Sequence, residues 1–161
     1  MTLHYLPEHR ENALLALDLA KKAAHQLRYS YQTLFDQPMD IHWVLQLPQH
    51  EDRAEKVEAF VSRFGRLQDH IGEKLVPKFA LLLGESTKSM VDIMGYAEKM
   101  QWVGSAEDFF SARKLRNLLI HEYMSDPQLF LDALLAARVA VEMLFQTVQA
   151  IESEAENINL T

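Results

Sequence analysis

Hydrophobic residues recur at three- and four-residue steps along most of the chain, the spacing of an apolar stripe on an amphipathic helix. The first such stretch covers residues 8–35 and predicts a long helix. A second stripe starts near Glu51 and reaches Leu75, and a third runs from Phe130 to Ile151 at heptad spacing. These three stretches predict the main helices of the fold.

Proline and glycine residues divide the stripes. Residues 37–40 include Pro38 and end the first helix, and residues 41–48 are expected to form an irregular, partly buried connection that contains Trp43. Pro77 should kink or interrupt the second helix, because proline removes one backbone hydrogen bond and clashes with the preceding turn. Gly84 then ends that helix.

A shorter helix is expected over residues 88–100, with Ser86 or Thr87 as its N-cap. Gly104 separates it from the next helix. On the second long helix, Gly65 and Gly72 are seven residues apart and therefore lie on one side, where another helix can approach closely.

Two further start signals define the C-terminal third. Ser105 and Asp108 are spaced like a capping box, with Asp in place of the usual Glu, and predict a helix over residues 106–122. Asp126 before Pro127 predicts the start of the last helix, because proline suits the first helical position.

Together these elements predict an all-α protein, an antiparallel bundle of four to five helices. The chain has 161 residues, which is the size of one domain, so residues 1–161 are expected to share one core. With 5 Gly and 5 Pro, the sequence has too few loop-forming residues for an all-β fold. The acidic tail, residues 152–161, is expected to fray.

The distribution of charge changes how the net charge of -7 is interpreted. Acidic residues are concentrated in residues 126–161, while Arg113, Lys114 and Arg116 form a local basic cluster. Such a cluster can bind RNA without a long-range steering field. The sequence has no cysteine and no apolar run long enough for a bilayer, so we expect a cytoplasmic protein with no membrane partner.

Candidate chemistry is concentrated in residues 116–123, which read RNLLIHEY. Arginine holds an anionic phosphate without losing its charge, and histidine moves protons near neutral pH. At about 100° per residue, Arg116 and His121 project about 140° apart on a helix. Asn117 lies almost directly below His121, whereas Tyr123 shares the side of Arg116. One helix therefore cannot place both groups closely around a phosphate. A second copy across a twofold axis would line one cleft with Arg and His from both subunits, so we expect a homodimer.

Arg116, the polar Asn117 and His121 resemble the R-x4-6-H signature of HEPN domains, helical bundles that often act as RNases. The extension through Tyr123 is similar to HEPN toxins that are paired with a minimal nucleotidyltransferase antitoxin. The resemblance implies a HEPN-like fold and RNA cleavage, of tRNA or mRNA for example, without a metal or other cofactor.

The resemblance also implies a role for each residue of the motif. His121 would transfer protons, Arg116 would neutralise the charge on phosphorus, and Asn117 would orient either group. Tyr123 would be the residue to which the antitoxin transfers AMP.

Several alternatives remain open at this stage. Arg116 and His121 can form an ordinary surface or interhelix pair, and Tyr123 an ordinary aromatic at a helix end. The protein can also be a HEPN binding subunit without catalysis, which partners a nucleotidyltransferase or presents a substrate to it. A third alternative is a purely structural helical-bundle dimer in which the motif only packs. Neighbouring polar residues can support the cleft or belong to a solvated face; they are Arg113, Arg63, Arg66, Asp69 and His70. The remaining histidines form no recognisable metal-ligand set.

Overall fold

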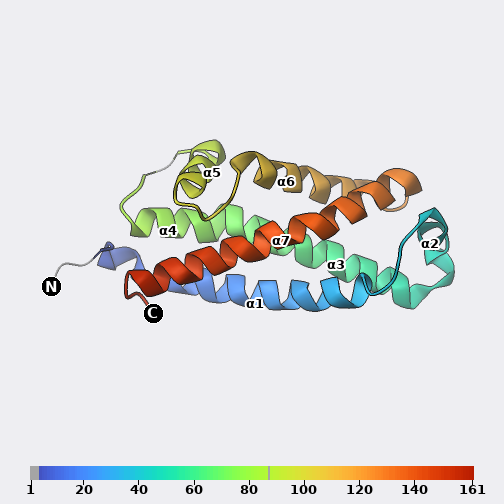
Figure 1. The fold of residues 1–161 in the computed structure, drawn as a ribbon, viewed down its shortest axis with the longest axis horizontal. Helices are drawn as coiled ribbons and strands as arrows, with labels where there is room; N and C mark the ends of the chain where they lie inside the picture. Colours follow the sequence, from blue (N-terminus) through green and yellow to red (C-terminus); the bar gives the residue numbers. More distant parts are fainter. Residues whose placement is uncertain (1–3, 87) are drawn as a thin grey trace.

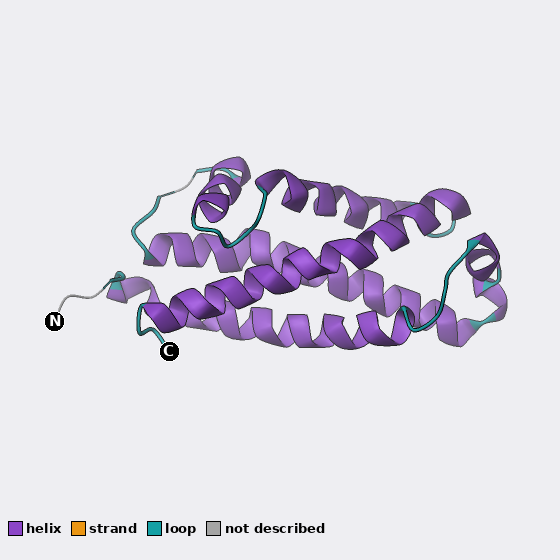
Figure 2. Cartoon of the chain, viewed as in Figure 1, coloured by secondary structure: helices purple, strands orange, loops and turns teal. Residues whose placement is uncertain are grey.

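The computed structural model describes residues 4–86 and 88–161, which contain helices, turns and loops but no strand (Figure 2). The all-α prediction is therefore confirmed for this part of the chain. In chain order the helices are α1 (Arg10–Leu34), α2 (Ile41–Leu45), α3 (Glu51–His70), α4 (Val76–Leu82), α5 (Met90–Lys99), α6 (Ala106–His121) and α7 (Pro127–Asn157). Short 3-10 turns at Pro7–His9 and Leu47–Gln49 precede α1 and α3.

The helices pack as a bundle around a core rich in phenylalanine. Helix α1 lies along α3, and α7 crosses both on one side of the bundle (Figure 1). Helix α6 packs against α3 and α7, and α5 packs against α4 and α6. Five phenylalanines are almost completely buried between these layers: Phe60, Phe64, Phe79, Phe109 and Phe130. Each contributes about 1.5–3 kcal/mol by burial.

The predicted interruption at Pro77 takes the form of a wider helical turn. Helix α3 passes into a π-helical segment, Ile71–Leu75, which leads directly into α4. An α-helical Pro77 would clash with the carbonyl of Glu73, four residues earlier, and that carbonyl lies within the wider segment. The chain therefore continues past Pro77 instead of breaking into a loop.

Two predictions about the connections were wrong. Residues 41–45 form the short helix α2, in which Asp40 Oδ1 accepts a hydrogen bond from the Trp43 amide at 2.9 Å. Helix α5 starts at Met90, and its N-cap is Ser89, whose Oγ accepts from the Asp92 amide at 3.1 Å. Thr87, the other expected cap, lies outside the described residues.

Both caps predicted in the C-terminal third are present. Ser105 Oγ accepts from the Asp108 amide at 3.2 Å, and Asp126 Oδ1 accepts from the Leu129 amide at 3.0 Å. Helix α6 ends at His121, one residue earlier than predicted.

The C-terminal segment differs from the expected frayed tail. Helix α7 continues to Asn157, and Ala155 and Leu160 are buried. Arg10 Nη2 donates a hydrogen bond to the Leu160 carbonyl at 3.3 Å. Of the acidic residues here, Glu152 pairs with Lys21 of α1 at 2.7 Å, and Glu156 is exposed. Within the described residues, none of the helices is both long enough and apolar enough to span a membrane.

Candidate functional site

Helix α6 carries the motif and lies directly on α3 because two glycines of α3 leave room for it. A Cβ atom on Gly65 would lie 2.7 Å from Arg116 Nε, and one on Gly72 would lie 3.0 Å from the ring of Phe109. Both neighbours belong to α6. The close approach predicted from the spacing of the glycines is therefore confirmed, and α6 is the approaching helix.

Arg116 points from α6 onto α3, where it meets a carboxylate. Its Nη2 lies 3.1 Å from Asp69 Oδ2, and its side chain is 34% exposed. The Nε atom is buried against Gly65 and has no hydrogen-bond partner among the described residues. The guanidinium is thus held by the Asp69 carboxylate, and the arginine side chain as a whole is only partly exposed.

His121 and Asn117 lie on the outer face of the same helix. Both are exposed, and together with Lys114 and Leu118 they line a shallow hollow of about 510 Å³. Arg116 lines a different hollow, between α3 and α6. Arg116 and His121 therefore line different hollows, and one chain does not bring them together in either of these cavities.

Tyr123 occupies the turn between α6 and α7, on the side of Arg116. The two residues line the same hollow of about 370 Å³. The Tyr123 ring packs edge-on against Phe130, with centroids 5.1 Å apart. Partial burial raises the pKa of the phenol, and the carboxylates of Glu58 and Glu51 raise it further. The phenol is therefore neutral near pH 7, so a reaction at its oxygen needs a base.

Of the neighbouring polar residues that could support the cleft, the structure places Asp69 beside the motif arginine. Arg113 is half-buried on α6, on the same helix. Arg66 instead contacts α1: its Nη1 donates to Gln26 Oε1 at 3.2 Å. It therefore belongs to the contact between α1 and α3 and not to the motif.

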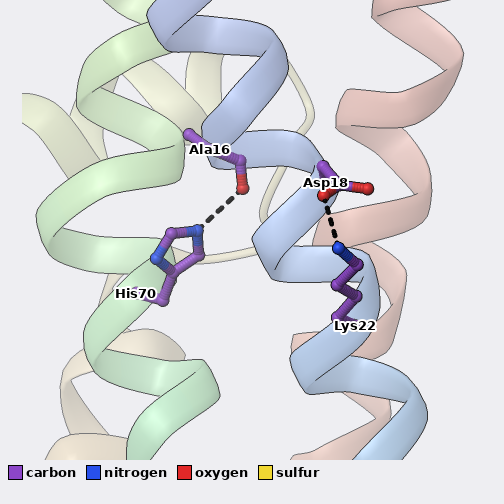
Figure 3. Close-up of polar contacts among 4 residues, drawn as sticks. All are labelled: Ala16, Asp18, Lys22 and His70. Carbon is purple, nitrogen blue, oxygen red and sulfur yellow. Dashed lines mark hydrogen bonds and ion pairs between the residues drawn. The ribbon is translucent and has the colours of Figure 1, made fainter.

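Arg63 and His70 also belong to the contact between α1 and α3. Arg63 Nη1 donates to Ser30 Oγ at 2.9 Å. His70 Nε2 donates to the Ala16 carbonyl at 2.7 Å, close to the Asp18–Lys22 ion pair on α1 (Figure 3). The sequence did not show that Arg63 and His70 contact α1 while Asp69 contacts Arg116, because these contacts depend on which face of α3 meets α6.

Sequence reasoning missed the acidic side chains around Tyr123. Glu51 and Glu58 lie on α3, far from Tyr123 in sequence, and only the packing of the α6–α7 turn against α3 brings them close. Within residues 4–86 and 88–161, no three His, Asp or Glu side chains are grouped as metal ligands would be. Comparisons with models of known protein families, with curated proteins and with solved structures find no match. Helix α6 and the turn after it are therefore the basis for assigning a function.

Proposed function

We propose that the protein is a metal-independent endoribonuclease of HEPN type, the toxin of a pair with a minimal nucleotidyltransferase. One observation carries the proposal: the R-N-x3-H-x-Y sequence lies at the C-terminal end of α6, with Asn117 and His121 exposed where a nucleic acid can reach them. The local basic residues Lys114 and Arg113 adjoin this face. They favour contact with phosphates without strong overall attraction.

The proposed reaction uses proton transfer and charge neutralisation. His121 accepts the proton of a ribose 2′-hydroxyl, whose oxygen attacks the adjacent phosphorus. The bond from phosphorus to the 5′ oxygen breaks, and that oxygen leaves with a proton returned by imidazolium. Arg116 neutralises the charge that develops on the phosphate oxygens, and Asn117 orients the reacting groups. The products are a 2′,3′-cyclic phosphate and a 5′-hydroxyl.

We propose that a second copy completes the site. Arg116 and His121 line separate hollows in one chain, so a phosphate bound by one chain cannot be enclosed by both groups. Packing of two α6 outer faces across a twofold axis would bring His121 and Asn117 of both copies to one cleft. To reach the phosphate, the Arg116 side chain of each copy would extend around α6 to the edge of this cleft.

Incubation of the purified protein with tRNA and with total RNA in EDTA tests this function. We expect discrete fragments that end in 2′,3′-cyclic phosphate. Intact RNA at enzyme concentrations that saturate binding would overturn the assignment as a ribonuclease.

A second candidate function is a HEPN binding subunit without catalysis, and the environment of Arg116 favours it. The guanidinium is held by Asp69, and its Nε is buried against Gly65, which is how a structural arginine is bound. This candidate predicts no cleavage in EDTA, together with transfer of AMP to Tyr123 by the partner nucleotidyltransferase.

A further inference from the structure

Two neighbouring hollows form a continuous surface along α3, and Glu58 and Tyr123 line both of them. The first, of about 370 Å³, lies between α3 and α6. The second, of about 390 Å³, lies between the start of α3, the α2 segment and the turn before α7. We call this surface the acidic groove; its charged lining residues are Glu51, Glu55, Glu58 and Arg116.

The charge of the groove is negative. Glu51, Glu55 and Glu58 are exposed and lie on one face of α3 at steps of three and four residues. Among the described residues that line the groove, the one cation is Arg116, and it is paired with Asp69. A partner that binds here must therefore supply positive charge.

The walls of the groove expose large apolar side chains. Ile120 is 50% exposed, Leu45 53% and Met124 87%. They come from α6, α2 and the α6–α7 turn, yet all three line the groove. A patch of exposed apolar residues with a polar rim is typical of a protein-binding surface.

The dimensions of the groove suit a helix. Its lining residues on α3 extend from Glu51 to Gly65, which is about 21 Å at the helical rise of 1.5 Å per residue. A helix of about four turns covers this length and can place apolar side chains at positions i, i+3 or i+4, and i+7 in the two hollows.

We propose that the acidic groove binds a basic amphipathic helix of another protein. Its apolar face would contact Ile120, Leu45 and Met124, and its Lys or Arg residues would pair with the glutamates of α3. A second copy of this chain fits less well, because a twofold contact would bring two sets of glutamates together. The carboxylates of α3 disfavour RNA along this part of the surface. Arg116 borders both the groove and the proposed ribonuclease site, but the glutamates and apolar side chains that would hold the helix are not part of that site, so the proposal does not depend on RNA cleavage.

Selection from a displayed library of 14-residue helical peptides tests the proposal, with the full-length protein as bait. We expect enriched peptides to carry apolar residues at helical spacing and several Lys or Arg residues. Their binding should weaken as salt rises, because the charged pairs are exposed. In methyl NMR spectra, their addition should shift the signals of Ile120 and Met124.

Charge reversal provides the matched comparison. Glu55→Lys/Glu58→Lys should weaken the selected peptides by about tenfold. The control Glu11→Lys/Glu142→Lys changes net charge equally at exposed sites on α1 and α7 and should change affinity by less than about twofold. Circular dichroism checks that each variant is folded.

Three results would overturn the proposal. The first is enrichment of acidic or uncharged peptides, or no enrichment. The second is an equal effect of both charge-reversal variants. The third is a change in oligomeric state on Glu55→Lys/Glu58→Lys, measured by sedimentation, because it would assign the groove to a second copy. Loss of RNA cleavage has no bearing on these outcomes.

Discussion

At the scale of single residues, the contact between Gly65 and Arg116 determines how closely α6 approaches α3. A Cβ at position 65 would lie 2.7 Å from Arg116 Nε, so Gly65→Ala must displace the arginine side chain. We expect the free energy of unfolding to fall by about 1 kcal/mol, since overpacking outweighs the higher helix propensity of alanine. Urea denaturation measures this change.

Gly95→Ala is the matched control for that substitution. Gly95 is also helical, and nothing lies within 4 Å of the Cβ it would gain. This variant should gain up to about 1 kcal/mol from helix propensity alone. An equal gain in Gly65→Ala would contradict the close packing of Arg116 on α3.

Tyr123 is the residue at which we predict regulation. A cognate nucleotidyltransferase with ATP and magnesium should add AMP to its phenol; Tyr123 lines the same hollow as Arg116. The added phosphate would occupy the arginine and repel RNA. Tyr123→Phe should retain much of the cleavage activity and escape silencing. Intact mass after co-expression measures the modification.

Tyr29→Phe is the control, because Tyr29 is well exposed on α1. It should acquire the same mass increase as the wild-type protein. The regulatory role of Tyr123 is rejected if the AMP-sized increase is absent, or if it persists in Tyr123→Phe.

At the scale of secondary-structure elements, the long helix α7 depends on a local start signal. Asp126 Oδ1 accepts from the Leu129 amide at 3.0 Å, and Pro127 follows it. Asp126→Ala should lower the free energy of unfolding by about 1 kcal/mol. Thermal unfolding measures this loss. The control Asp132→Ala removes an exposed carboxylate of the same helix and should lower the free energy of unfolding by less than about 0.5 kcal/mol. If both variants lose the same free energy of unfolding, the Asp126 cap has no specific stabilising effect.

Elements fixed by local signals were predictable from the sequence. The apolar stripes of α1, α3 and α7 and the caps Ser105 and Asp126 involve residues within a few positions of one another. The short helix α2 was missed although Asp40 caps it locally, because its five residues are too few to show an apolar stripe; the helix packs on α7, which is distant in sequence. The extension of α7 was missed for a similar reason, since Ala155 and Leu160 are buried by tertiary packing.

The features of the candidate site that depend on local spacing could also be predicted from the sequence. The angle between Arg116 and His121 follows from helical geometry, and the spacing of Gly65 and Gly72 indicated a close neighbour. The ion pair with Asp69 and the glutamates near Tyr123 depend on how α6 and α3 face each other. No local pattern in the sequence specifies that orientation.

At the scale of the whole molecule, the separation of Arg116 and His121 predicts a site shared by two copies. A heterodimer of one wild-type and one Arg116→Ala/His121→Ala subunit should lose far more than half of the activity, because both subunits supply groups to one cleft. Differently tagged subunits allow the heterodimer to be purified and assayed. Half activity would indicate independent sites, and fully active monomers in sedimentation at assay concentration would exclude a shared one.

The most direct test of the central claim is RNA cleavage in EDTA by substituted proteins that remain folded. His121→Ala and Arg116→Ala should each abolish cleavage of tRNA or total RNA, and Arg116→Lys should restore little, because an ammonium lacks the planar fork of the guanidinium. His25→Ala, which removes an exposed histidine of α1, should cleave like the wild-type protein. Cleavage that persists in both alanine variants of the motif would contradict the assignment of α6 as the catalytic helix.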